Sequence, residues 1–353
     1  MTGLPADHPS RRFRSSAYIR AARNQPAGHT PVWFQRQAGR SLPEYRAVRT
    51  EGSILDTILD PKLSAEITMQ PVRRYGVDAA ILFSDIVVPI AAVGFGMDVV
   101  PGVGPVVEQP FSRREDLSRL RQLEPEVDTP HVIETVKLLV DQLDVPLIGF
   151  AGAPFTLASY LIEGQPSRTY AHTKALMLGD EQLWHDLMER LSDLAIASLR
   201  SQIHAGASAV QLFDSWAGSL DRATYEHYVA PHTTRVIAEI ADLDVPKALF
   251  GVGTGELLQP MAATGVDLLG VDWRIPIDVA RARIGANIAI QGNLDPAILG
   301  APWSAVEAAT RDILKRNAGR PGHVFNLGHG VLPETDPDVL QRIVELVHAE
   351  TSS

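Results

Sequence analysis

The sequence contains no cysteine in 353 residues. Without cysteine the chain can form no disulfide, no thiolate nucleophile, no iron–sulfur cluster and no zinc site with sulfur ligands. It also lacks a His-Glu-x-x-His stretch and any tight cluster of histidines along the chain. We therefore expect no bound metal, because any site would have to be assembled from scattered histidines and carboxylates.

Long apolar runs are missing too. No stretch of 18 consecutive apolar residues occurs, so no transmembrane helix is predicted. The basic cluster at residues 11–14 is not followed by the apolar core that a signal peptide requires. These absences predict a soluble cytoplasmic protein without a membrane partner. The hydrophobic content of 45% is enough for a large folded core.

Lysine is absent from the first 50 residues, which hold nine arginines and only two acids, Asp7 and Glu44. This segment carries a charge of +7, although the whole chain has a net charge of −10. The remaining 303 residues are therefore at −17. With a pI near 5.6 the chain offers no extended basic face, so nucleic acid is not expected as a partner.

The stretch that concentrates this positive charge spans residues 31–46. It begins as an apolar, strand-like run and then becomes a loop carrying Arg36 and Arg40 around the small pair Ala38 and Gly39. Two guanidinium groups held close together suit carboxylates or phosphates, and a glycine lets a ligand approach the backbone. The alternative is a solvated loop whose arginines pair with Glu44. The position directly after a strand favours the anion-binding interpretation.

Eight short apolar runs alternate with amphipathic segments. The runs cover residues 31–34, 78–83, 146–150, 209–213, 246–250, 266–271, 287–291 and 323–327. Apolar residues near 3.6-residue spacing mark helices at residues 61–75, 130–143, 180–205, 222–242, 255–264, 276–284, 303–318 and 334–349. A strand followed by a helix, repeated eight times, predicts an α/β fold with a (β/α)8 or TIM barrel.

The domain organisation follows from the same pattern. Residues 1–12 are predicted to form a flexible N-terminal arm, and residues 13–350 a single catalytic barrel, because no linker-like change of composition interrupts them. Residues 86–128 are rich in glycine and proline and break the strand–helix alternation. We interpret them as an insertion after the second strand, made of a hairpin and a loop.

The carboxyl ends of barrel strands hold the active site in this fold. Polar or titratable residues at these ends are Arg36, Arg40, Asp85, Tyr160, Asp214, Ser215 and His329. Each has a structural alternative: Asp85 can cap a turn, Asp214 or Ser215 can begin a helix, and Tyr160 can be a packing residue. His329 stands between two glycines and is free to meet a ligand.

Several blocks resemble the motifs of one family, the uroporphyrinogen decarboxylases. Besides Arg-Gln-Ala-Gly-Arg at 36–40, the resemblance rests on residues 83–86, 149–164, 211–215, 270–273, 291–295 and 325–330. Gln35 and Ser41 depart from residues that are usual in the family. The resemblance implies a barrel, a homodimer, no cofactor, and a reduced tetrapyrrole as small-molecule substrate. The substrate-binding positions that it implies are Arg36, Gln37, Ala38, Gly39, Arg40, Asp85, Tyr160, Phe213, Ser215 and His329, with catalysis assigned to Asp85, Arg36 and Arg40.

The reaction implied is the loss of carbon dioxide from the four acetate arms of uroporphyrinogen III to give coproporphyrinogen III in haem synthesis. A protonated pyrrole can accept the electron pair, so no cofactor is needed. Two other functions remain open from the sequence. A methyltransferase of a related barrel superfamily would use zinc held by Cys and His, which this chain cannot provide. A non-catalytic tetrapyrrole-binding barrel would keep the arginines but would have no need of Asp85.

Overall fold

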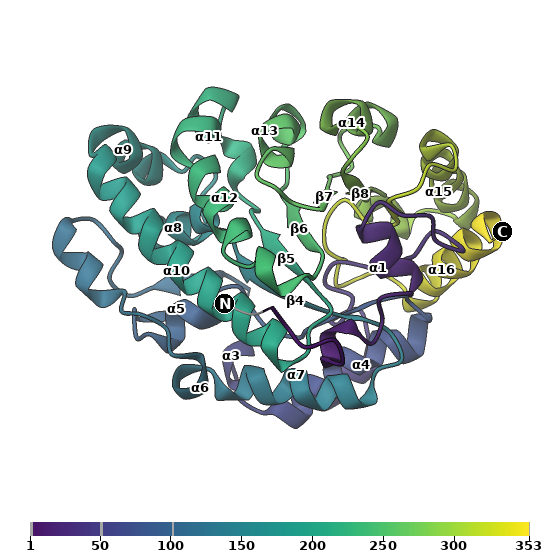
Figure 1. Ribbon diagram of the computed structural model, residues 1–353, viewed down its shortest axis with the longest axis horizontal. Helices are drawn as coiled ribbons and strands as arrows, with labels where there is room; N and C mark the ends of the chain where they lie inside the picture. The colour runs from purple at the N-terminus through teal and green to yellow at the C-terminus, as the bar shows by residue number, and fades with distance from the viewer. Residues whose placement is uncertain (1–2, 50–51, 101, 353) are drawn as a thin grey trace.

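The computed structural model describes residues 3–49, 52–100 and 102–352 of the chain. Its main sheet has seven parallel strands that follow one another in chain order (Figure 1). These strands are β1 (Ala80–Ile81), β4 (Leu147–Gly152), β5 (Ala209–Phe213), β6 (Lys247–Phe250), β7 (Leu268–Gly270), β8 (Ala289–Gln291) and β9 (His323–Val324). They coincide with the last seven of the eight predicted runs.

Helices connect the strands and surround the sheet (Figure 1). Those that match the predicted segments are α4 (Pro61–Tyr75), α7 (Pro130–Gln142), α10 (Glu181–Ala205), α11 (Arg222–Tyr228), α12 (Ala230–Ala238), α13 (Leu258–Ala262), α14 (Ile277–Ile284), α15 (Trp303–Asn317) and α16 (Pro337–Thr351). The remaining helices are α1 (Ala17–Ala22), α2 (Pro43–Val48), α3 (Ile54–Ile58), α5 (Val88–Ala92), α6 (Pro125–Asp128), α8 (Pro154–Glu163) and α9 (Ala171–Gly179).

The ends of α4 illustrate why these segments are helical. Asp60 accepts hydrogen bonds from the backbone N–H groups of Lys62 and Leu63, and Pro61 occupies the first helical position. Gly76 ends the helix with a φ of 67°, a conformation that glycine adopts without strain. The following β1 then enters the sheet beside β4.

The prediction of eight sheet strands was wrong by one within the described residues. Residues 31–34 form only an isolated bridge, Val32 to Phe325. Only the Trp33 N–H donates to neighbouring backbone, to Phe325 O at 3.3 Å. Pro31 has no N–H, Val32 donates to Asp78 Oδ2 at 2.7 Å, and Phe34 donates to Gln37 Oε1 at 3.0 Å. Side chains thus accept bonds that a neighbouring strand would accept in a ladder.

The same segment nevertheless joins the two edges of the sheet. Phe325, directly after β9, donates its N–H to Pro31 O at 2.8 Å, and Asp78, just before β1, donates to Val32 O at 2.8 Å. The sheet must therefore curl so that β1 and β9 both reach residues 31–34. Inside it, the Trp33 indole N–H donates to Gln291 on β8, and Gln291 donates to Gln211 on β5, each at 3.0 Å.

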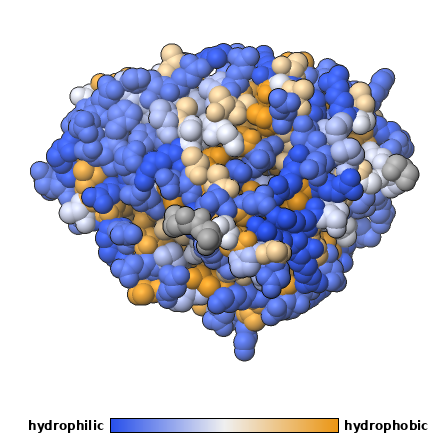
Figure 2. Space-filling view, viewed as in Figure 1, coloured by the Kyte–Doolittle hydropathy of each residue, from blue (hydrophilic) through white to orange (hydrophobic). Residues whose placement is uncertain are grey.

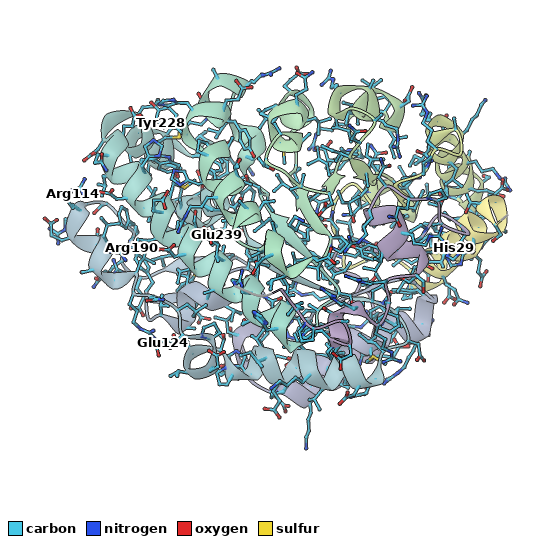
Figure 3. The ribbon with its side chains drawn as sticks, in the orientation of Figure 1. His29, Arg114, Glu124, Arg190, Tyr228 and Glu239 are labelled. Atoms are coloured by element: carbon cyan, nitrogen blue, oxygen red, sulfur yellow. The ribbon has the colours of Figure 1, made fainter. Side chains whose placement is uncertain are left out.

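Asp78 is also bound by two histidines. His29 Nε2 lies 2.7 Å from Oδ1 and His348 Nε2 lies 2.8 Å from Oδ2. His29, labelled in Figure 3, lies beside α16, which carries His348. Despite the desolvation that opposes it, the bonds from both histidines and from the Val32 N–H lower the pKa of Asp78. Asp78 therefore ties the first segment, the sheet and the last helix together.

Residues 86–128 contain α5, a two-stranded antiparallel hairpin and α6. The hairpin pairs β2 (Met97–Val100) with β3 (Gly104–Val107), and Val100 lies opposite Gly104. Val107 donates its N–H to Gly164 O at 2.8 Å, which attaches the hairpin to the end of α8. The hairpin is thus held close to the helix that follows β4. Its description as an insertion into a barrel remains a prediction.

The N-terminal segment uses part of its positive charge internally. Arg11, Arg14 and Arg23 all form ion pairs with Asp244. A short 3-10 helix, Pro9–Arg11, packs against α10. The charge of this segment therefore does not all serve a ligand. The flexibility of residues 1–12 and the domain limits stay predictions, and residues 1 and 2 lie outside the described part.

The core is continuous, and its largest fully buried side chains include Trp33, Trp184 and Phe155. The face seen in Figure 2 is mainly hydrophilic, with hydrophobic side chains in small separate groups. Among the helices of the described ranges, none is both long enough and apolar enough to cross a membrane.

Candidate active site

A cavity of about 620 Å³ lies at the carboxyl ends of the strands. The last residues of β1, β5 and β6, namely Ile81, Phe213 and Phe250, line it, and residues of the β2–β3 hairpin form part of its wall. Nine of the ten predicted binding residues line this cavity: Arg36, Ala38, Gly39, Arg40, Asp85, Tyr160, Phe213, Ser215 and His329. Residues from several widely separated parts of the chain contribute to it, as expected for a site built on strand ends.

Arginines dominate the charge of this cavity. Arg36 and Arg40 line it together with Arg49, which the sequence analysis did not single out. Arg36 has a φ of 57°, which is uncommon outside glycine and is found at sites where a side chain must point in a set direction. Arg49 lies with its guanidinium carbon 6.0 Å from the centre of the Tyr45 ring. In the sequence, the only indication that Arg49 belongs to the site was its position in the arginine-rich first 50 residues.

Asp85 is the only carboxylate among the described residues that line the cavity. It follows β1, and its Oδ1 accepts the Val87 N–H at 3.1 Å. Desolvation raises the pKa of Asp85, although the Val87 N–H and the positive charge of Arg36 oppose the rise. Its side chain is partly accessible from the cavity while protein surrounds it on the other sides. Asp85 is therefore an acid at the floor of a positively charged cavity.

His329 enters the cavity from the loop after β9. Its Nδ1 accepts the Gly330 N–H at 2.7 Å, which leaves Nε2 as the nitrogen that can meet a ligand. Desolvation lowers the pKa of His329, and the charges of Arg36 and Arg274 lower it further, while Asp272 opposes them. The imidazole is thus a neutral hydrogen-bond donor in the free protein at neutral pH.

Aromatic side chains form the apolar wall. Phe213 makes edge contacts with Phe150 and Phe250 at ring distances of 5.4 and 6.3 Å. Tyr160 meets Trp216 edge-on at 5.7 Å. Burial raises the pKa of Tyr160 to about 12, and the charge of Asp85 adds to the rise. Its hydroxyl therefore stays protonated and can donate a hydrogen bond. An aromatic, apolar surface in the same cavity as the arginines suits a large ring with anionic arms.

One predicted residue lies elsewhere. Gln37 is fully buried, accepts the Phe34 N–H, and donates to Ala79 O at 3.1 Å. It supports the loop that carries the arginines, and direct substrate contact by Gln37 remains only a prediction. The two departures from the family pattern, Gln35 and Ser41, are both buried and both line the cavity.

Asp214 lies beneath the site, next to Ser215. It is fully buried, and its Oδ1 accepts the Thr156 hydroxyl at 2.8 Å. Its Oδ2 has no hydrogen-bond partner in the described part of the chain. Burial raises the pKa of Asp214 to about 7. Thr156 also accepts the Trp216 N–H at 3.2 Å, so this pair fixes the loop that holds Ser215 and Trp216 in the cavity wall.

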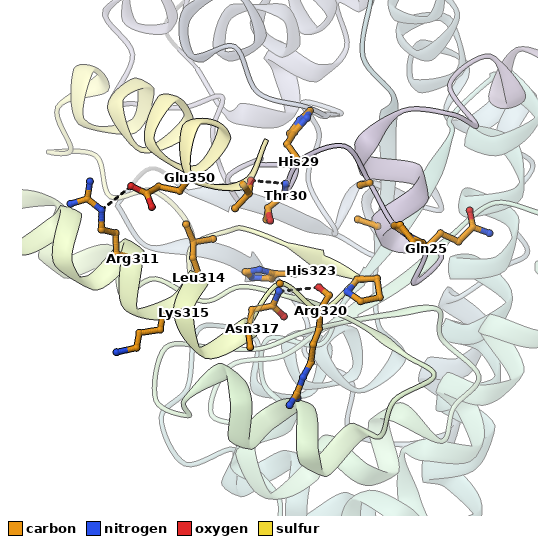
Figure 4. Close-up of a pocket in the computed structure, with 18 residues that line it drawn as sticks. Gln25, His29, Thr30, Arg311, Leu314, Lys315, Asn317, Arg320, His323 and Glu350 are labelled. Carbon is orange, nitrogen blue, oxygen red and sulfur yellow. Dashed lines mark hydrogen bonds and ion pairs between the residues drawn. The ribbon is translucent and has the colours of Figure 1, made fainter. Parts of the chain in front are cut away.

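A second cavity, of about 780 Å³, lies at the opposite ends of the strands between α1, α15 and α16 (Figure 4). His323, the first residue of β9, lines it and binds Gly292 O through Nε2 at 2.9 Å. Burial lowers the pKa of His323 to about 4, so the ring is neutral. Residues at the amino ends of barrel strands usually serve stability rather than catalysis.

Known proteins resemble this chain over most of its length. A sequence model of the family described as uroporphyrinogen decarboxylase (URO-D) matches residues 14–350. A Salinispora tropica protein named uroporphyrinogen decarboxylase is 58% identical over 351 residues, covering 99% of this chain and 92% of the relative. A Streptomyces avermitilis protein of the same name is 58% identical over 338 residues, covering 96% and 95%.

Among solved structures, a methyltransferase from Methanosarcina mazei has a TM-score of 0.72 over 95% of this chain and 98% of its own. At 18% sequence identity this likeness shows a shared fold and carries no chemistry. The matches in sequence extend over nearly the whole chain and include the loops that form the cavity. The chain belongs to the uroporphyrinogen decarboxylase family.

Proposed function

We propose that the cavity at the strand ends is where this chain acts as a carboxy-lyase, removing carbon dioxide from the four acetate arms of uroporphyrinogen III to give coproporphyrinogen III. The observation that carries the proposal is the charge pattern of the cavity. Among the described residues that line it, one carboxylate, Asp85, lies with Arg36, Arg40, Arg49 and His329. A substrate with anionic arms and a ring that becomes cationic requires both signs of charge.

The arginines provide the positive charge that the anionic arms of the substrate require. Each guanidinium can bind a carboxylate through two parallel hydrogen bonds, which fixes the position of the arm as well as attracting it. His329 can add a hydrogen bond from Nε2. Arg40 and Arg49 line the cavity from the segment that follows residues 31–34. They can therefore bind acetate or propionate arms that are not reacting.

Asp85 provides the negative charge that a cationic ring requires. Protonation of a pyrrole carbon makes a ring cation conjugated with the acetate methylene. The bond from the methylene to the carboxylate then breaks, carbon dioxide leaves, and the electron pair neutralises the ring. A second proton adds to the methylene carbon to give the methyl group, and the proton first added to the ring is released. A carboxylate beneath the pyrrole N–H groups stabilises the cation while it exists.

The ring supplies the electron sink, so the residues that carry out this reaction need no cofactor. We infer that residues 31–34 close the curled seven-stranded sheet into a barrel, since they bond to both of its edges. A homodimer in the cytoplasm, usual for the family, is our expectation for this chain as well.

The decisive assay incubates the purified chain anaerobically with the eight-carboxyl porphyrinogen and follows formation of the four-carboxyl product. We expect stepwise loss of four carboxyl groups without added cofactor. Tight binding without turnover would favour a non-catalytic tetrapyrrole-binding protein. Transfer of a methyl group to a thiol acceptor, with no decarboxylation, would favour the methyltransferase alternative.

A further inference from the structure

Two histidines and a glutamate converge in the helical layer outside the active site. Glu181 begins α10, His185 lies one turn later on the same helix, and His227 lies near the end of α11. Glu181 Oε1 is 2.9 Å from His227 Nε2 and 3.7 Å from His185 Nε2, and all three atoms lie within 4.8 Å of one another. Tyr228, labelled in Figure 3, stacks on His185 and marks the place.

We propose that Glu181, His185 and His227 form a binding site for a divalent first-row transition metal ion, such as Zn²⁺. Donor atoms about 2.0 to 2.2 Å from an ion lie roughly 3 to 3.5 Å from one another. Two of the separations, 2.9 Å and 3.7 Å, are near these values, and the separation of the two imidazole nitrogens is at most 4.8 Å, so side-chain rotation would complete the site. Two imidazoles and one carboxylate favour Zn²⁺, Ni²⁺ or Cu²⁺ over Mg²⁺ or Ca²⁺.

A buried neighbour orients the first of these histidines. His185 Nδ1 is 2.8 Å from Nε2 of His232, which is buried, and His232 Nδ1 lies 3.2 Å from Glu189 Oε1. With its proton on Nδ1, toward Glu189, His232 accepts from the His185 Nδ1–H. His185 Nε2 is then a lone pair that faces Glu181 and His227, as in metal sites with an outer hydrogen-bond partner.

Access and position fit such a site. The side chains of Glu181 and His227 are 53% and 59% exposed, so an ion can reach them from solvent with water as further ligands. In the described part of the chain, none of the three residues lines the active-site cavity. The ion would join α10 to α11, the helix that follows the Ser215–Trp216 loop. The expectation of no metal, drawn from the sequence, is therefore revised for this site: histidines 42 positions apart meet only in the fold.

A second group of similar composition, His29, Asp78 and His348, is a weaker candidate. Both oxygens of Asp78 already accept hydrogen bonds, from His29, from His348 and from the Val32 N–H. The bond to Asp78 raises the pKa of His29, which favours the protonated ring that cannot bind metal. This group holds the fold together, and it serves as the internal comparison in the experiment.

The test measures binding of Zn²⁺ to the chelator-treated full-length chain by titration calorimetry, and of Cu²⁺ by electron paramagnetic resonance. We expect one ion per chain, with hyperfine splitting from two nitrogen ligands. His227→Gln and Glu181→Gln should each weaken Zn²⁺ binding by about tenfold or more. His185→Gln should reduce the splitting to one nitrogen. His172→Gln, an exposed histidine on α9, is the matched control and should bind as the parent does.

Circular dichroism confirms that each variant is folded, and decarboxylase activity should remain at the parental level without metal. The proposal is overturned if the His227 and Glu181 variants bind Zn²⁺ as tightly as the parent. It is also overturned if His348→Gln alone abolishes binding, which would place the ion at Asp78, or if half an ion binds per chain, which would place it between two copies. These outcomes do not depend on the identity of the substrate.

Discussion

Gly330 makes room for Arg36. A β-carbon on residue 330 would lie 2.5 Å from Cδ of Arg36, 2.8 Å from Cγ and 3.2 Å from Cβ. These atoms include the base of the arginine side chain, so rotation of its far end cannot relieve the contact. The loop after the last strand therefore determines where the first arginine of the cavity can lie.

Gly330→Ala should move Arg36 away from its position and lower kcat/KM by about tenfold or more, the cost of one weakened charge-assisted contact. The melting temperature should change little by comparison, since His329 and Gly330 line the open cavity. Steady-state kinetics with the porphyrinogen substrate, beside thermal melting, separate the two effects. Gly300→Ala, whose β-carbon would meet no atom within 4 Å, is the control. Unchanged kinetics in Gly330→Ala would show that activity does not depend on this position of Arg36.

Arg36→Lys and Arg40→Lys test whether the cavity needs the shape of guanidinium or only its charge. A lysine carries the same charge but cannot form two parallel bonds to a carboxylate. Each replacement should cost on the order of 1.5 to 3 kcal/mol in kcat/KM. Arg20→Lys, in the same charged segment but outside the cavity lining, should be neutral. Near-normal turnover in both cavity variants would contradict the proposal that each guanidinium binds a substrate carboxylate through two parallel hydrogen bonds.

His329 should give binding a pH dependence. Its pKa is lowered, so in the free enzyme the ring becomes a cation only below its usual pKa, near 6.5. A cation beside the substrate carboxylates strengthens binding, so kcat/KM should rise as pH falls from about 7 toward 5.5. His329→Gln should flatten this slope while keeping a hydrogen-bond donor. Identical pH profiles for parent and variant would make His329 a turn residue.

Asp214→Asn should change the pH dependence of stability. The folded pKa of Asp214, about 7, lies above its ordinary value, so the folded state binds more protons and stability falls as pH rises from about 4 to 7. Asparagine removes this loss, which is on the order of a few kcal/mol. The variant should gain stability relative to the parent at pH 8 more than at pH 5, in urea unfolding. Asp141→Asn, an exposed carboxylate, should show no such difference.

The sequence predicted much of this fold because the signals are local. Strand residues 209–213 and helix residues 61–75 were placed at their observed limits by apolar patterning, an N-terminal Asp-Pro pair and a C-terminal glycine. Residues 31–34 were misjudged because their composition is that of a strand. The N–H groups of Val32 and Phe34 donate to the side chains of Asp78 and Gln37, which no local pattern records.

The site residues were likewise predicted where the signal was local and missed where it depended on tertiary packing. Arg36, Asp85 and His329 each lie two residues after the end of a predicted strand, so position along the chain was enough to propose them. Arg49 reaches the cavity from beyond α2, and Gln37 turns inward to Ala79, although both lie close to Arg36 in sequence. The histidines at 185 and 227 belong to different helices, and only tertiary packing brings them to Glu181.

Asp85→Asn tests the central step of the mechanism. A carboxylate repels every acidic arm of the substrate, and the repulsion grows as the cavity excludes water. Asp85 therefore has no use in binding alone. In the proposed mechanism, its charge helps only when positive charge develops on a pyrrole ring above it. Desolvation already raises its pKa, which shows that the site holds this acid against an unfavourable environment.

Asparagine keeps the size of the side chain and one acceptor oxygen but removes the charge. Product affinity should stay the same or weaken only slightly, while kcat should fall by about 10² or more, as when one electrostatic stabiliser of a transition state is deleted. Asp85→Glu should also be slow, because its extra methylene displaces the carboxylate. Asp98→Asn, on the hairpin, should behave as the parent. The measurement is kcat beside product affinity, and a kcat within a few-fold of the parent would make Asp85 a structural residue and the mechanism wrong.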